Sequence, residues 1–197
     1  MFKKLLLLIS ISLFSISSFS YSQLNFGIGV IDEDSDYVRG TASDIFITYS
    51  GYTDSNVLYE VGYNYYSTDY YELGSVYEMD AGILKGKVGY GFGDLEEGSF
   101  FLNGFYANRS LEVDGVNAND LIDRSGFGVE VGYMRMGEDS TNFEIYVELD
   151  LDDCEYNCET LWGGADFPIG SSNWNFGFKA GVSGDLTWLS IGPSIKF

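Results

Sequence analysis

Apolar and polar side chains alternate along ten segments of this chain, and a period of two is typical of β-strands with one apolar face. In the clearest segment, 142–151, every second residue from Phe143 to Leu151 is apolar and most residues between them are acidic. The segments predict strands at 23–31, 43–52, 57–66, 81–92, 99–109, 125–136, 142–151, 160–169, 174–182 and 186–197. Their lengths are close to the roughly 9–11 residues that a tilted strand needs to cross a bilayer.

The connections between these segments alternate in length. Those after the second, fourth, sixth and eighth segments are short, at 53–56, 93–98, 137–141 and 171–173. Those after the first, third, fifth and seventh are longer, at 32–42, 67–80, 110–124 and 152–159. Only the last connection, 184–185, departs from this order. Short turns at one end and longer loops at the other are typical of transmembrane β-barrels.

The first 22 residues predict a secretory signal peptide. Lys3 and Lys4 precede an apolar run from Leu5 to Phe14, which has the length of a signal-peptide core and is too short to span a bilayer. The small residues needed for cleavage occur in two overlapping frames, ending at Ser20 or at Ser22. We therefore expect residues 1–22 to be removed and residues 23–197 to form one domain. An uncleaved anchor is the alternative.

The end of the chain carries a resemblance to a known class. The last predicted strand alternates through Leu189, Ile191 and Ile195 and ends on Phe197. This ending resembles the signal read by the barrel assembly machinery of Gram-negative bacteria. With the signal peptide and the alternating strands, the mature chain resembles small outer-membrane barrels of the OmpA/OmpX type. The resemblance implies an all-β fold, an antiparallel transmembrane β-barrel in the bacterial outer membrane, with lipid and lipopolysaccharide as surroundings. Ten strands are preferred and eight are the alternative.

The distribution of charge predicts which face of each strand meets lipid. On the cleanest strands the apolar face carries a single charge, Arg135, at the end of its strand. A soluble sandwich could also bury an apolar face, but aromatic residues concentrate near the short turns, as in an interfacial girdle. The opposite face is then the lumen. Its predicted lining is Glu60, Lys85, Lys87, Glu130, Glu144, Glu148, Asp150, Asp166 and Lys179.

These luminal charges leave two interpretations open. Isolated buried charges are costly, so the side chains are expected to be paired or hydrated. A barrel of eight to ten strands has little spare interior, which favours a lumen plugged by ion pairs. The excess of acids supports the alternative, a narrow pore that prefers cations.

Composition excludes several kinds of chemistry. The chain has no histidine, so serine–histidine and cysteine–histidine catalysis are excluded, and no catalytic, cofactor or metal site is predicted. Its net charge of −20 is unfavourable for nucleic-acid binding. Cys154 and Cys158 lie in an acidic stretch, and an exported context predicts a disulfide between them. Half a zinc site is the less favoured interpretation.

The four longer connections each carry four acidic residues, which predicts acidic surface loops. The sequence therefore predicts a non-enzymatic outer-membrane barrel with acidic loops and an ion-paired, plugged lumen. A small cation-preferring pore is the first alternative. An adhesin or receptor that binds an unidentified surface ligand through its loops is the second.

Overall fold

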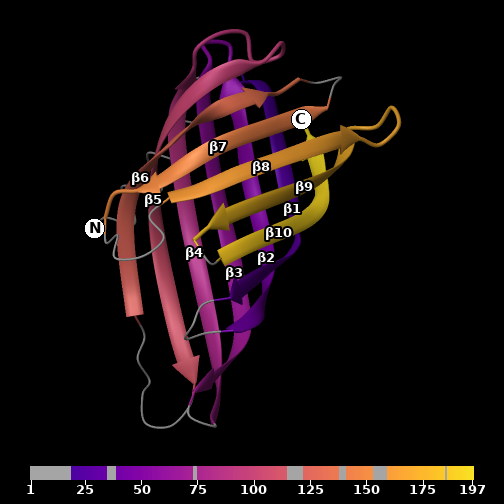
Figure 1. Ribbon diagram of the computed structural model, residues 1–197. Coiled ribbons are helices and arrows are strands. Elements are labelled where there is room, and N and C mark those ends of the chain that lie inside the picture. The colour runs from indigo at the N-terminus through magenta and orange to yellow at the C-terminus, as the bar shows by residue number, and fades with distance from the viewer. Residues whose placement is uncertain are drawn as a thin grey trace, which may run out of the picture.

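The computed structural model describes residues 19–34, 39–72, 75–114, 122–137, 141–152, 159–184 and 186–197. In these residues ten antiparallel strands form a closed barrel (Figure 1). The strands are β1 (Phe19–Asp34), β2 (Arg39–Thr53), β3 (Val57–Glu72), β4 (Ser75–Gly91), β5 (Ser99–Asp114), β6 (Ile122–Arg135), β7 (Asn142–Asp150), β8 (Glu159–Pro168), β9 (Trp174–Ser183) and β10 (Leu186–Lys196). Each strand pairs with its sequence neighbours, and β1 pairs with β10. The predicted all-β barrel with ten strands is confirmed, and none of the described residues forms a helix long and apolar enough to cross a membrane.

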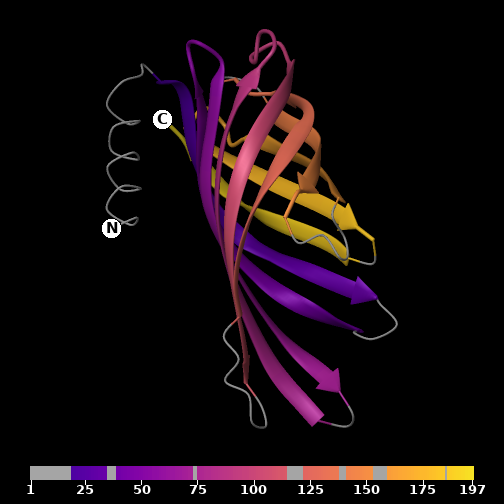
Figure 2. The same ribbon diagram turned by 90° about the vertical axis from the view of Figure 1, so that its left-hand side faces the viewer.

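The barrel wall is taller on one side than on the other. Strands β1 to β6 have 14 to 17 residues, whereas β7 to β10 have 9 to 11. At the long-loop end, the β1–β2 pair separates from the β3–β4 pair (Figure 2). The tall side therefore extends the barrel on the side of the longer connections.

The extra length corrects three predicted connections, and one of them is 110–124, because β5 continues to Asp114 and β6 begins at Ile122. The predicted loop 67–80 is largely strand, because the β3–β4 ladder continues to the pair Glu72–Ser75. The predicted loop 32–42 is shortened in the same way by the pair Asp34–Arg39. Backbone pairing continues here although apolar and polar residues no longer alternate regularly, so the pattern alone set the strand ends too early. β1 likewise begins at Phe19, four residues before the predicted start.

The seam between β1 and β10 depends on glycine at two facing positions. Gly27 and Gly192 lie close together, and a Cβ atom on Gly192 would collide with the carbonyl oxygen of Phe26. A Cβ atom on Gly27 would collide with the carbonyl oxygen of Ile191. The two strands approach closely here because neither residue has a side chain.

The outer surface of the barrel is apolar. Side chains that alternate outward on every strand are exposed, including Ile28 at 63%, Ile45 at 59%, Val88 at 59%, Val131 at 55% and Phe127 at 60%. Along β9 the exposed and buried positions alternate through most of the strand. Exposed apolar patches on soluble monomers rarely exceed a few hundred Å². A continuous apolar wall of this kind is unfavourable in water, so another apolar phase has to cover it.

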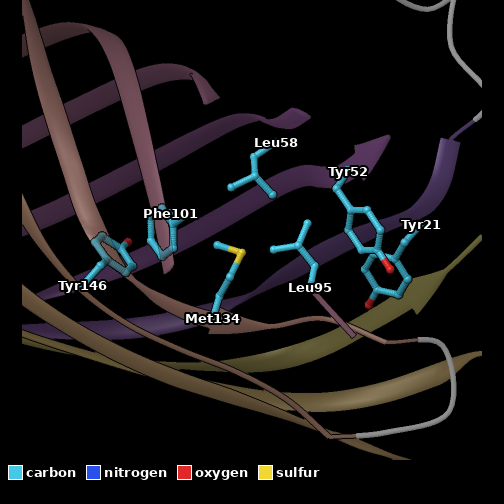
Figure 3. Close-up of a cluster of buried hydrophobic side chains, with 7 residues drawn as sticks. All are labelled: Tyr21, Tyr52, Leu58, Leu95, Phe101, Met134 and Tyr146. Atoms are coloured by element: carbon cyan, nitrogen blue, oxygen red, sulfur yellow. The ribbon is translucent and has the colours of Figure 1, made fainter. Parts of the chain in front are cut away.

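The buried apolar core lies inside the barrel near the short turns (Figure 3). It consists of Tyr21, Tyr52, Leu58, Leu95, Phe101, Met134 and Tyr146. The rings of Tyr21 and Tyr52 stack with centroids 5.6 Å apart. On β5, Phe101 faces the interior at 2% exposure, whereas its neighbour Phe100 faces outward at 68% exposure.

Candidate functional site: the barrel interior

The barrel encloses a cavity of about 740 Å³. Its lining includes all nine charged residues that the sequence predicts for the lumen: Glu60, Lys85, Lys87, Glu130, Glu144, Glu148, Asp150, Asp166 and Lys179. They come from β3, β4, β6, β7, β8 and β9, where alternation turns every second side chain inward. The lining reaches Thr68 and Met79 towards the long-loop end.

Glu130 lies at the centre of a lattice of ion pairs. Its carboxylate is 1% exposed and lies 3.1 Å from the Nζ atoms of both Lys85 and Lys87. The Nδ2 atom of Asn103 donates to its second oxygen at 3.2 Å. Lys85 also pairs with Glu148 at 2.6 Å, and Lys87 pairs with Glu60 at 2.8 Å. We call these two lysines and three glutamates the central lattice.

Among the described residues, ion pairs also lie outside the central lattice. Lys179 pairs with Glu144 at 2.8 Å, and Arg109 pairs with Asp150. The aromatic ring of Tyr146 contributes to the same interior, because Lys87 and Lys179 lie 5.4 and 4.9 Å from its centroid. The interior charges are therefore compensated by pairing and by aromatic faces, which is what burial requires.

A leucine from a turn packs inside the barrel at its short-turn end. Leu95, in the connection between β4 and β5, is 1% exposed and packs within the apolar core. In Figure 3 it lies between Met134 and the stacked rings of Tyr21 and Tyr52. The turn is fixed by a hydrogen bond from the Met136 amide to the Leu95 carbonyl, at 2.8 Å. We call this arrangement the Leu95 stopper.

Sequence reasoning missed the Leu95 stopper. A signal for it does exist, because Leu95 is an apolar residue between Asp94 and the acids Glu96 and Glu97 in an otherwise polar turn. An apolar side chain at such a position gains nothing from contact with water, so burial of Leu95 is the simpler interpretation. Whether it turns into the barrel depends on the turn geometry, which includes Gly98 at a φ of 116°.

A polar network lies beside the stopper. The Nδ2 atom of Asn142 donates to the Tyr21 hydroxyl at 2.6 Å, and that hydroxyl donates to Oε1 of Gln23 at 2.5 Å. The Nε2 atom of Gln23 donates to Asp166 at 3.3 Å. Lys196, from the last strand, donates to the Gly137 carbonyl at 3.0 Å. These contacts tie β1, β7, β8 and β10 together at the short-turn end.

Asp44, on β2, lines the other part of the cavity and was also missed. It is 6% exposed, and its oxygens accept from the Asn64 amide at 3.4 and 3.5 Å. Its burial has a local cause, because Gly29 faces it on β1 and a Cβ atom there would lie 3.1 Å from the Asp44 carboxylate. The alternation in 43–52 could have indicated that Asp44 faces inward.

Some predicted features lie outside the described residues. Cys154 and Cys158 are among them, as is most of the predicted signal peptide. Phe197 is described, and its amide donates to the Ser22 carbonyl at 2.9 Å. The described residues hold no group of three or more acidic or cysteine side chains placed to bind a metal.

Comparison with known proteins yields structural matches only. No family model matches the chain, and no curated protein matches it. The translocator domain of the autotransporter NalP from Neisseria meningitidis is similar at a TM-score of 0.53 and 12% identity, covering 99% of this chain and 94% of that one. The fold is that of an outer-membrane β-barrel. The outer membrane protein OprG from Pseudomonas aeruginosa is also similar, with a TM-score of 0.48, 13% identity, and coverage of 92% of this chain and 97% of that one.

Proposed function

We propose that this chain is a non-enzymatic barrel of the bacterial outer membrane whose interior does not conduct ions. Packing at two levels of the interior supports the proposal. The central lattice occupies the middle of the interior, and the Leu95 stopper lies beneath it at the short-turn end. An ion that crosses the barrel would have to separate buried ion pairs and displace a packed turn, and both steps are costly.

The outer surface supports a membrane location. Replacing one outward residue by lysine or arginine at the bilayer midplane costs about 2–4 kcal/mol, so such a face is kept free of charge. The apolar side chains that project outward, such as Ile28 and Val131, match this requirement. Lipid and lipopolysaccharide are accordingly the proposed surroundings of the barrel, and the barrel assembly machinery is the proposed route into the membrane.

Export through a cleaved signal peptide is part of the proposal, and the interior contacts favour one cleavage frame. Tyr21 is 1% exposed, stacks on Tyr52 and receives a hydrogen bond from Asn142. Cleavage after Ser22 would remove this residue from the core. Cleavage after Ser20 would keep it, so we propose that the mature chain begins at Tyr21.

The size of the cavity favours one second candidate, a small cation-preferring pore. Among the described residues its lining holds eight carboxylates and six basic side chains, which leaves a modest excess of negative charge. A cavity of about 740 Å³ also holds space that a fully plugged barrel would not. For this candidate the Leu95 stopper would have to open.

Planar-bilayer recording separates the two candidates. We expect the purified barrel to give no steady conductance steps in potassium chloride. Leu95→Ser removes the stopper and should give intermittent openings, whereas Glu97→Ser, an exposed position in the same turn, should not. Steady cation-selective steps from the unaltered protein would establish the pore instead.

A further inference from the structure

Asp44 differs from the other carboxylates that line the cavity away from its exposed rim. Glu60, Glu130, Glu144, Glu148 and Asp150 each form an ion pair with a lysine or arginine. Within the described part of the chain, no base pairs with Asp44, and its partner is the neutral amide of Asn64. Asp44 is nevertheless buried, since the residue is 6% exposed.

Asp166, the remaining acid of the predicted lumen, is in a different situation. It accepts a hydrogen bond from Gln23, and both Lys179 and Lys196 lie within electrostatic range of it. Among the described residues, the Asn64 amide donates to the Asp44 carboxylate and the Tyr66 phenol lies within electrostatic range of it, and neither side chain is a base. Asp44 is therefore the charge in this interior that is least compensated, and a buried charge without a counter-ion is unfavourable.

The surroundings of Asp44 define the kind of cation that fits. Phe46 and Tyr66 line the cavity with it, and the Tyr66 phenol lies within electrostatic range of the Asp44 carboxylate. A single carboxylate does not meet the six to eight oxygen ligands that a calcium ion takes. One carboxylate beside aromatic faces is instead the arrangement that holds an ammonium group attached to an apolar body.

The position of Asp44 also suits entry from the long-loop end. It pairs across the ladder with Gly29 and Tyr66, on the part of the wall that leads to Thr68 and Met79. The Leu95 stopper lies at the opposite end. The chain carries a net charge of −20, and such a field raises the local concentration of cations.

We propose that Asp44 and the cavity in front of it bind small organic ammonium ions that enter from the long-loop side. The carboxylate pairs with the ammonium group, and Phe46 and Tyr66 contact the apolar body. The entry direction rests on the proposed closure at the Leu95 stopper. The ammonium site itself rests on the charge balance and lining of the cavity.

The probe for this site is 4-fluorophenethylammonium, observed by fluorine NMR with the detergent-solubilised barrel in low-salt buffer. We expect saturable line broadening from the unaltered protein. Asp44→Asn should weaken binding at least tenfold, because it removes the charge while keeping the shape. Asp152→Asn is the matched control, since it makes the same charge change at an exposed position of the same cavity lining, and we expect it to stay within twofold.

The neutral analogue 4-fluorophenethyl alcohol separates charge recognition from apolar partitioning, and it should bind at least tenfold more weakly than the ammonium ion. Equal binding of the two probes, equal binding by the Asp44→Asn variant, or no saturable broadening would each overturn the proposed site. Heat-modifiable gel migration shows whether each variant is folded. If Asp44→Asn does not fold, the comparison of the two probes on the unaltered protein decides. Bilayer conductance tests the stopper separately, so the two proposals can fail independently.

Discussion

The central lattice predicts that losing a base lowers the free energy of unfolding more than losing an acid. The two variants compared are Glu130→Gln and Lys87→Met, and each breaks an ion pair of Glu130. Two lysines, Lys85 and Lys87, face the three carboxylates of Glu60, Glu130 and Glu148. Glu130→Gln leaves one carboxylate for each lysine, at 2.6 Å for Lys85–Glu148 and 2.8 Å for Lys87–Glu60. Lys87→Met leaves three carboxylates to share one lysine.

The magnitudes follow from burial. Glu130→Gln keeps a side chain that can hydrogen-bond, so we expect the free energy of unfolding to fall by about 2 kcal/mol, the scale of a hydrogen bond to a charged group. Lys87→Met leaves Glu130, 1% exposed, with Lys85 as its one remaining base in the lattice. An uncompensated buried charge costs about 3–5 kcal/mol, so this variant should lose roughly twice as much.

Urea titration of the barrel folded in lipid vesicles, followed by tryptophan fluorescence, measures both losses. Lys179→Met is the matched control, because its pair with Glu144 is one-to-one and both side chains are about 30% exposed. Its loss should be about 1 kcal/mol, as for a pair near solvent. If Glu130→Gln destabilises the barrel as much as Lys87→Met, then charge balance does not govern this interior and the reasoning is wrong.

Three other predictions test the wall, the seam and the start of the barrel. Val131→Arg, at an outward position that is 55% exposed, should lower the free energy of unfolding in lipid vesicles by about 2–4 kcal/mol; a change within 0.5 kcal/mol would mean that water covers this face. Gly192→Ala should sharply reduce the folded, heat-modifiable fraction, because the added Cβ collides with the Phe26 carbonyl. Gly104→Ala is the control and should fold normally, because no atom lies within 4 Å of its added Cβ. Equal folded fractions of the two variants would contradict the close approach of β1 and β10. Mass spectrometry of the protein from the membrane should give a chain beginning at Tyr21, and a chain beginning at Gln23 would refute the proposed cleavage frame.

The fold was predictable because two independent features of the sequence agree. Strict alternation, as in 142–151, determines which side chains share a face, and Glu144 and Glu148, which it predicts to face inward, line the cavity. The alternating lengths of the connections then favoured a transmembrane β-barrel. Strand ends were less predictable, because the β3–β4 ladder continues beyond the regular pattern to Glu72 and Ser75.

The candidate site was predictable only in its residue types. Alternation places Glu130, Lys85 and Lys87 inside the barrel, but it does not give the stagger between strands that brings them within 3.1 Å. Leu95 was missed because turns carry no periodicity that indicates direction. Asp44 was missed as an uncompensated charge, since this requires knowing where every lysine and arginine lies in three dimensions.

The central claim is that the outward apolar side chains contact hydrocarbon while the inward ones do not. The three tryptophans of the chain test this directly, because Trp174 faces outward at 42% exposure and Trp162 and Trp188 line the cavity. The measurement is fluorescence quenching by lipids brominated near the upper part of their acyl chains. A variant that keeps only Trp174 should be strongly quenched, and a Trp174→Phe variant that keeps the two interior rings should be quenched weakly. Equal quenching of the two variants, or no quenching of Trp174, would contradict a barrel that presents this wall to lipid.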